Sequence, residues 1–174
     1  DNILVIGIGG AGRACVLSAL NLYKNNLIYL FNRSYFKAKK FKLKLKSKNI
    51  KVLKNYKALS KIKNVKLVIN ASSVGFNSWF QSKKGYYNLK YFSPISNLTK
   101  IRSVRLRNEK KFVKINASLI KLNILETYCF FKKNNKAKVF DIIYNPQKTI
   151  LQEICELFNN KTYNGLNMNL EQAV

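Results

Sequence analysis

The sequence contains no histidine, only three cysteines and two prolines, and 7 acidic residues against 33 basic ones. Cys15, Cys129 and Cys155 lie far apart, without a Cys-x-x-Cys pair or an imidazole to complete a ligand set, so we predict no metal site. No apolar run approaches the roughly 18 residues of a membrane helix, and no basic segment precedes the apolar start, as it would in a secretory signal. We therefore expect reduced thiols, no membrane contact, and a location in the cytoplasm or an organelle stroma.

The charge is strongly one-sided, at +26 for 174 residues. Dense positive charge attracts polyphosphates of any sequence, so nucleic acid is one candidate partner. However, the basic residues are mostly lysines spread over the whole chain, beside many Asn, Ile, Tyr and Phe residues. This distribution favours drift toward AT-rich codons over selection for one binding face, and we do not expect nucleic acid to be the partner. With 47% hydrophobic residues, the chain can form one globular domain.

The first half of the chain alternates strand and helix patterns. Residues 3–6 are a continuous apolar run that ends at Gly7, which is typical of a parallel strand buried on both faces. Apolar residues then recur at helical spacing to about Tyr23, and residues 27–31 indicate the next strand. Ser34 is placed to cap a Lys-rich helix that ends near Lys48. Further strand patterns occur at 51–53 and 66–69. The alternation predicts an α/β fold: a Rossmann-like, doubly wound, mostly parallel sheet with helices on both faces.

The alternation stops between residues 80 and 136, in a stretch rich in Lys, Arg, Asn and Tyr. We predict that 80–136 is a basic insertion, mainly a partly disordered surface loop. An alternative is an anion or RNA patch formed by Arg102, Arg105, Arg107, Lys110 and Lys111. Strand and helix patterns resume at 139–143 and 149–158, with a short strand near Thr162 and a possible helix start after Asn167.

The glycines after the first strand fit the pattern Gly-x-Gly-x-x-Gly through Gly7, Gly9 and Gly12. A turn without side chains lets backbone N–H groups and the positive end of a helix approach a pyrophosphate. The same glycines could also serve only a tight turn from strand to helix. Their position in a strand, helix, strand unit favours a dinucleotide site.

The end of the second strand indicates which dinucleotide is bound. An NAD site generally places a carboxylate about 20 residues after the glycines, but Asn32, Arg33 and Ser34 occupy this position, and Lys37 follows one helical turn later. A guanidinium and a hydroxyl suit a 2′-phosphate, which favours NADP. The alternative is an arginine without a ligand in an already basic chain.

Four separated segments resemble the C-terminal NADP-binding domain of the shikimate dehydrogenases. They are residues 3–14 (ILVIGIGGAGRA), Asn32-Arg33-Ser34 with Lys37-Ala38, residues 70–75 (NASSVG), and the tail 140–173. In the tail, FDIIYNPQKT and NGLNMNLEQA match the family's Asp-x-x-Tyr-x-Pro-x-x-Thr and Asn-Gly-Leu-x-Met-x-x-x-Gln segments. The tail motifs are more specific than the glycine turn, which many Rossmann proteins share, including the related glutamyl-tRNA reductases.

The resemblance implies an oxidoreductase that passes hydride reversibly between shikimate or 3-dehydroshikimate and NADP, in the chorismate branch of aromatic amino-acid biosynthesis. The residues that it implies for the coenzyme are Gly7, Ile8, Gly9, Gly10, Ala11, Asn32, Arg33, Ser34, Lys37, Asn70, Ala71, Ile142 and Gly165. The residues that it implies for the substrate are Tyr144 and Gln172.

The resemblance covers only part of such an enzyme. The family's catalytic Lys and Asp belong to an N-terminal substrate domain that precedes this segment, so we expect residues 1–174 alone to be inactive and to be cut from a longer chain. A quinate dehydrogenase would carry a similar coenzyme domain. A catalytically silent Rossmann module with a nucleic-acid or regulatory surface is the alternative from another class.

Overall fold

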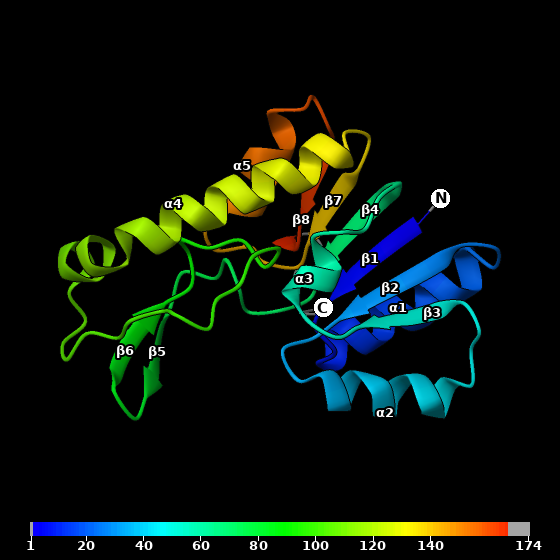
Figure 1. The fold of residues 1–174 in the computed structure, drawn as a ribbon, viewed down its shortest axis with the longest axis horizontal. Helices are drawn as coiled ribbons and strands as arrows, with labels where there is room; N and C mark the ends of the chain where they lie inside the picture. The colour runs from blue at the N-terminus through cyan, green and yellow to red at the C-terminus, as the bar shows by residue number, and fades with distance from the viewer. Residues whose placement is uncertain (1, 167–174) are drawn as a thin grey trace.

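A six-stranded parallel sheet forms the centre of the computed structural model, which describes residues 2–166 (Figure 1). The strand order is β3-β2-β1-β4-β7-β8, so the order reverses between β1 and β4. The strands are β1 (Asn2–Ile6), β2 (Leu27–Phe31), β3 (Ile50–Leu53), β4 (Val65–Asn70), β7 (Lys138–Asp141) and β8 (Thr162–Asn164). All five strand pairs of this sheet are parallel, which confirms the predicted doubly wound fold.

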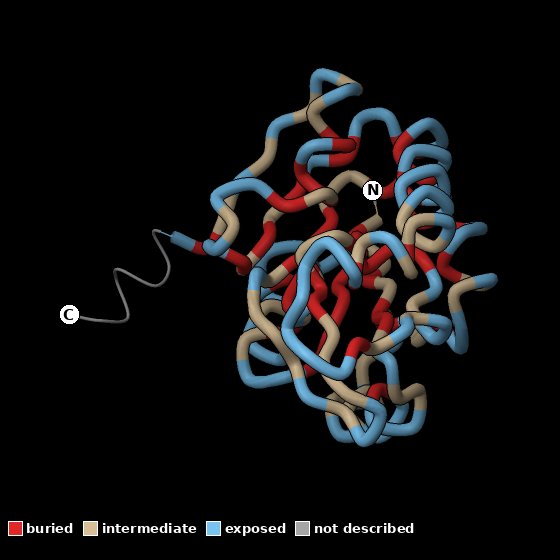
Figure 2. The backbone as a smooth tube through the Cα atoms, turned by 90° about the vertical axis from the view of Figure 1, so that its left-hand side faces the viewer, coloured by how far each residue is buried: buried red, intermediate tan, exposed pale blue. Residues whose placement is uncertain are grey.

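Helices cover both faces of the sheet (Figure 1). They are α1 (Gly10–Leu22) and α2 (Tyr35–Leu45) on one face, and α3 (Tyr56–Leu59), α4 (Glu109–Lys133) and α5 (Ile150–Glu156) on the other. Within β1, Ile3 and Val5 pack in the α1 and α2 layer, whereas Leu4 and Ile6 pack in the opposite layer. Because both faces are buried, the strand needs apolar residues at every position. Figure 2 shows the buried backbone concentrated in the middle of the molecule.

Residues 80–136 are ordered, so the prediction of a partly disordered loop is wrong. The segment begins within an antiparallel hairpin of β5 (Trp79–Ser82) and β6 (Gly85–Asn88) and continues into the 25-residue helix α4. Near its start, α4 packs Phe112 against the hairpin, whereas Phe130 and Phe131 near its end belong to the sheet's own core. That 80–136 is an insertion relative to other proteins remains a prediction.

Buried asparagines account for the order of this segment. Asn116 accepts from the amide of Arg102 at 2.9 Å and donates to its carbonyl at 3.0 Å. Asn123 makes the same pair of bonds with Ser93, at 2.8 Å and 2.9 Å. Each side chain therefore satisfies both backbone groups of one loop residue, as a neighbouring strand would. The two asparagines fasten the loop before α4 to the helix.

Among residues 2–166, no helix combines the length and apolar character that a membrane crossing requires.

Candidate functional site

The glycine turn follows β1, at the point where the strand order reverses. Gly7 has a φ of +94°, and a Cβ atom there would lie 2.6 Å from the carbonyl oxygen of Ala71. A Cβ atom on Gly12 would lie 2.2 Å from the carbonyl oxygen of Gly7. These two glycines let β1, the loop after β4 and α1 approach one another closely. They therefore shape the turn.

Gly9 and Gly10 differ, because a Cβ atom on either would meet no heavy atom within 4 Å. Helix α1 begins at Gly10, and its N-cap residue Gly9 offers no side-chain hydrogen bond to the first turn. The first amides of a helix lack intrahelical partners and carry partial positive charge. The open space beside Gly9, Gly10 and Ala11 thus suits an anionic group such as a pyrophosphate, while Ile8 is buried in the core.

Two exposed cations follow β2, next to the glycine turn. The amide of Gly7 donates to the carbonyl of Phe31 at 2.8 Å, which holds the turn against the end of β2. Arg33 and Lys37 come next, and both side chains are exposed. Burial raises the pKa of Tyr56, and the positive charge of Arg33 opposes that shift, which places the guanidinium near α3. The residues that follow β2 therefore offer positive charge, which suits a 2′-phosphate. A carboxylate at the same position would favour the free 2′-hydroxyl of NAD.

Asn32 and Ser34 shape the turn between these cations. The Nδ2 atom of Asn32 donates to the carbonyl of Ser34 at 3.0 Å. The hydroxyl of Ser34 accepts from the amide of Lys37 at 3.5 Å and caps α2, as the sequence predicted. A role for either residue in coenzyme binding remains a prediction.

Asn70 ends β4, and its side chain is fully buried. Its Nδ2 atom donates to the carbonyl of Val74 and to Asp141 Oδ1, both at 2.9 Å. Its Oδ1 atom accepts from the amide of Ser72 at 3.1 Å and from the Ser72 hydroxyl at 2.7 Å. The polar atoms of this side chain are thus used within the protein. Asn70 shapes the loop that carries Ala71, and its predicted place along the coenzyme remains a prediction.

Asp141 ends β7 beside Asn70 and is also fully buried. Its Oδ1 atom also accepts from the amide of Ile143 at 3.0 Å, and its Oδ2 atom accepts from the Thr149 hydroxyl at 2.8 Å. Desolvation by burial raises the pKa of Asp141 to about 6, and these hydrogen bonds partly oppose the shift. Asp141 and Thr149 begin and end the motif Asp-x-x-Tyr-x-Pro-x-x-Thr, but no role was predicted for either from the sequence.

Ile142, Tyr144 and Gly165 lie around the loop that follows β7. The amide of Ile142 donates to the carbonyl of Asn70 at 3.0 Å. A Cβ atom on Gly165 would lie 2.0 Å from the carbonyl oxygen of Ile142, so this position requires glycine. Tyr144 is 47% exposed, and its ring centroid lies 6.0 Å from that of Phe76. The structure thus brings Ala71, Ile142 and Gly165 to one end of the sheet, while Gln172 lies outside the described residues.

Arg13, in the first turns of α1, has a role that was not predicted from the sequence. Its Nε atom donates to the carbonyl of Ile8 at 3.2 Å, and its guanidinium carbon lies 5.7 Å from the ring centroid of Phe41 in α2. Arg13 therefore braces the glycine turn against α2. The residue lies inside the quoted segment GAGRA, but the spacing alone gives no indication of this bond.

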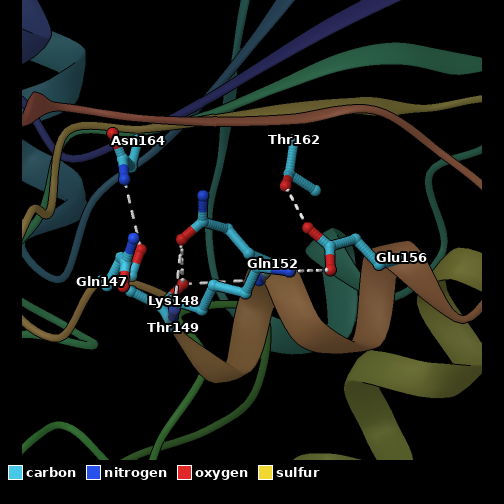
Figure 3. A network of polar contacts seen from close by, with 7 residues as sticks. All are labelled: Gln147, Lys148, Thr149, Gln152, Glu156, Thr162 and Asn164. Atoms are coloured by element: carbon cyan, nitrogen blue, oxygen red, sulfur yellow. Dashed lines mark hydrogen bonds and ion pairs between the residues drawn. The ribbon is translucent and has the colours of Figure 1, made fainter. Parts of the chain in front are cut away.

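A separate polar network joins α5 to β8, the outermost strand (Figure 3). Glu156 accepts from Lys148 Nζ at 2.7 Å and from the hydroxyl of Thr162 at 2.6 Å. Asn164 Nδ2 donates to the carbonyl of Gln147 at 3.2 Å. The residues that make these contacts line a cleft of about 470 Å³. The contacts fix the edge of the sheet near the loop that follows β7.

Comparisons with known proteins find a similar curated protein, although no family model matches the chain. A shikimate dehydrogenase (NADP(+)) of Methanococcus maripaludis (strain C7) is 29% identical over 175 residues, which cover 99% of this chain and 46% of that protein. The chain is thus similar, along nearly its whole length, to part of a shikimate dehydrogenase.

Solved structures of shikimate dehydrogenases have the same fold. A chorismate mutase/shikimate 5-dehydrogenase fusion protein from Clostridium acetobutylicum matches with a TM-score of 0.58 and 24% identity, over 99% of this chain and 44% of that one. The shikimate 5-dehydrogenase of Listeria monocytogenes, in complex with shikimate and NAD, matches with a TM-score of 0.59 and 23% identity, over 99% and 48%. The chain thus spans about half the length of the shikimate dehydrogenases that it matches.

Proposed function

We propose that this chain is the NADP-binding domain of a shikimate dehydrogenase, which in the intact protein transfers hydride between NADP(H) and shikimate or 3-dehydroshikimate. One observation carries the proposal: the uncapped N-terminus of α1 faces open space at Gly9 and Gly10, and the exposed Arg33 and Lys37 follow the end of β2, which is hydrogen-bonded to Gly7. Backbone donors, open space and two cations match a pyrophosphate that is joined to a 2′-phosphorylated ribose. The relative of Methanococcus maripaludis, named for NADP(+), supports the same coenzyme.

The residues of this chain would bind and orient the coenzyme. The amides of Gly9, Gly10 and Ala11 would hold the pyrophosphate, and Arg33 with Lys37 would neutralise the 2′-phosphate. Ala71, Ile142 and the backbone of Gly165 would lie along the nicotinamide half. When bound, the nicotinamide accepts or donates the hydride, so this domain's contribution is orientation and charge placement. Tyr144 and Gln172 would contact the substrate.

The remaining groups of the reaction would come from elsewhere in the protein. We expect a substrate domain upstream of residue 1 to supply the lysine and aspartate that assist proton transfer, with the substrate between the two domains. The choice between shikimate and quinate would be made there. A cytoplasmic or stromal location also remains a prediction.

The experiment is a fluorescence titration of the 174-residue chain with NADPH and with NADH at 0.15 M salt. We expect NADPH to bind at least tenfold more tightly, because an arginine and 2′-phosphate pair contributes about 1.5–3 kcal/mol. Arg33→Met should weaken NADPH by about tenfold or more and NADH by less than about twofold, since NADH lacks the phosphate that the guanidinium contacts.

Arg105→Met is the matched control, because Arg105 is also an exposed arginine but lies before α4, away from the glycine turn. Its NADPH affinity should equal that of the unmodified chain. Equal losses of NADPH and NADH in Arg33→Met would refute the 2′-phosphate role. Tight RNA binding that persists at 0.5 M salt, without NADPH binding, would favour the silent module instead.

A further inference from the structure

Buried polar groups at the ends of β4 and β7 form one continuous chain of hydrogen bonds. It runs from Ser72 through Asn70 to Asp141, then to Thr149, and from Thr149 to Gln152 in α5. Each residue after Ser72 is at most 2% exposed. A buried network of this kind fixes the position of every backbone segment that it bonds.

The network holds two loops that carry residues of the candidate coenzyme site. Asn70 fixes loop 71–75 through the carbonyl of Val74 at 2.9 Å. Asp141 fixes loop 142–146 through the amide of Ile143 at 3.0 Å. The first loop carries Ala71, and the second carries Ile142 and Tyr144. A disturbance at Asp141 would therefore displace both loops.

Thr149 has a choice of two acceptors. Its Oγ1 atom lies 2.8 Å from Asp141 Oδ2 and 3.4 Å from Gln152 Oε1, which also accepts from the Thr149 amide at 3.1 Å (Figure 3 shows Thr149 beside Gln152). A hydroxyl has one proton, so it donates to one of the two at a time. Beside an ionised Asp141 it donates to the carboxylate. When Oδ2 binds a proton from solvent, that O–H can donate to Oγ1, and the Thr149 hydroxyl can rotate toward Gln152.

We propose that Asp141, Thr149 and Gln152 form a positioning relay, in which rotation of the Thr149 hydroxyl keeps loops 71–75 and 142–146 in place whether Asp141 is ionised or protonated. One proton enters at Oδ2 and no covalent bond other than that O–H forms or breaks. The bonds of Oδ1 to Asn70 and Ile143 are the same in both states. The effect on the coenzyme rests on the proposed function, but the position of the loops does not.

The surroundings of Asp141 agree with this relay. The groups that bond it are uncharged and come from β4 (Asn70), α5 through its cap (Thr149) and its own loop (the Ile143 amide). The charged pair nearest along the chain, Lys148 and Glu156, is bonded to itself at 2.7 Å. Because the pKa of Asp141 is raised to about 6, both protonation states are populated near neutral pH.

The test uses substitutions at a fixed pH of 7.5, since the coenzyme's own phosphate titrates near pH 6. Asp141→Asn mimics the protonated acid: its Oδ1 can accept from Asn70 and Ile143, and its Nδ2 can donate to Thr149. Asp141→Ala removes every bond. The readouts are hydrogen exchange of the Ile143 amide, which needs no coenzyme, and the Kd for NADPH.

We expect Asp141→Asn to change both readouts by less than about threefold, and Asp141→Ala to raise both by about tenfold or more. Thr149→Val should impair both readouts by about tenfold or more in either background, because the Asp141 carboxylate then lacks its donor and the introduced amide lacks its acceptor. In the Asp141→Asn background, Thr149→Ser should keep both readouts near those of Asp141→Asn alone, because serine retains the hydroxyl.

Asp141→Asn that is as impaired as Asp141→Ala, or Thr149→Val variants that keep both readouts unchanged, would overturn the relay. If Asp141→Ala does not fold, the comparison of the Asn, Val and Ser variants decides the matter. If the unmodified chain binds no NADPH, the proposed function fails, and the exchange rates of Ile143 still test the relay.

Discussion

Two glycines of one turn should respond to substitution in opposite ways. A Cβ atom on Gly9 meets open space, and the backbone there has a φ of −63°, which any residue adopts. A Cβ atom on Gly12 would lie 2.2 Å from the carbonyl oxygen of Gly7 and 2.8 Å from its carbon. Gly9→Val should therefore impair coenzyme binding alone, whereas Gly12→Ala should impair the fold.

The magnitudes follow from these contacts. Relief of the Gly12 overlap requires α1 and β1 to separate by about 1 Å, and overpacking of this kind costs about 1–3 kcal/mol. For a domain of this size, that loss lowers Tm by roughly 2–12 °C. Gly9→Val weakens the N-cap of α1 by up to about 1 kcal/mol. Valine also reduces the backbone freedom of the unfolded chain, which offsets part of that loss. The Tm of Gly9→Val should therefore change by less than about 3 °C.

Thermal unfolding and NADPH titration of the two variants test this reasoning. Gly9→Val should weaken NADPH by at least tenfold, because the side chain occupies the space beside the helix amides, which contribute about 1.5–3 kcal/mol to an anion. Gly12→Ala should bind NADPH within about threefold while it is folded. The reasoning fails if Gly9→Val keeps its affinity, or if its Tm falls as far as that of Gly12→Ala.

Three further predictions concern single side chains. Arg13→Met should weaken NADPH and NADH equally, by about three- to tenfold in a titration, because Arg13 braces the turn through Ile8 rather than contacting the phosphate; a loss confined to NADPH would contradict this. Asn123→Leu leaves both backbone groups of Ser93 without partners and should cost roughly 2–4 kcal/mol in denaturant unfolding, whereas Lys121→Leu on the exposed side of α4 should cost less than about 0.5 kcal/mol. The pKa of Asp141 rises from 3.8 to about 6 on folding, so the folded state binds more protons than the unfolded state. The free energy of unfolding of the unmodified chain, relative to that of Asp141→Asn, should therefore fall by up to about 3 kcal/mol between pH 4 and pH 7 and then level off. A relative stability that rises with pH would contradict this.

The strands and the glycine turn could be predicted because their local patterns agree with the fold. Residues 3–6 and 27–31 are buried on both faces, so their apolar runs are unbroken. Ser34 predicted the start of α2 through its capping hydroxyl. In each case the residue's own chemistry decides the local structure.

The full length of helix α4 could not be predicted, because polar residues occupy part of its buried face. Asn116, Asn123 and Thr127 lie on its buried face, whereas Leu122 and Leu125 are 48% and 57% exposed. Sequence periodicity assumes apolar residues inside and polar residues outside. The buried amides are favourable here only because loop residues 93 and 102 supply their partners, and those contacts join positions 14 and 30 residues apart.

The candidate site divides in the same way. Gly9 and Arg33 could be found from spacing, because a pyrophosphate needs a turn without side chains and a 2′-phosphate needs a cation. The bracing role of Arg13 and the buried roles of Asn70 and Asp141 depend on contacts between segments distant in the sequence. The resemblance assigned Asn70 to the coenzyme, and its burial reveals a positioning role within the protein.

A crystal structure of the 174-residue chain with NADP⁺ would show whether the glycine turn and Arg33 bind the coenzyme. We expect the pyrophosphate to lie within hydrogen-bond distance of the amides of Gly10 and Ala11, with the 2′-phosphate within about 3 Å of the Arg33 guanidinium. A coenzyme bound elsewhere, or one whose 2′-phosphate points away from Arg33, would contradict it.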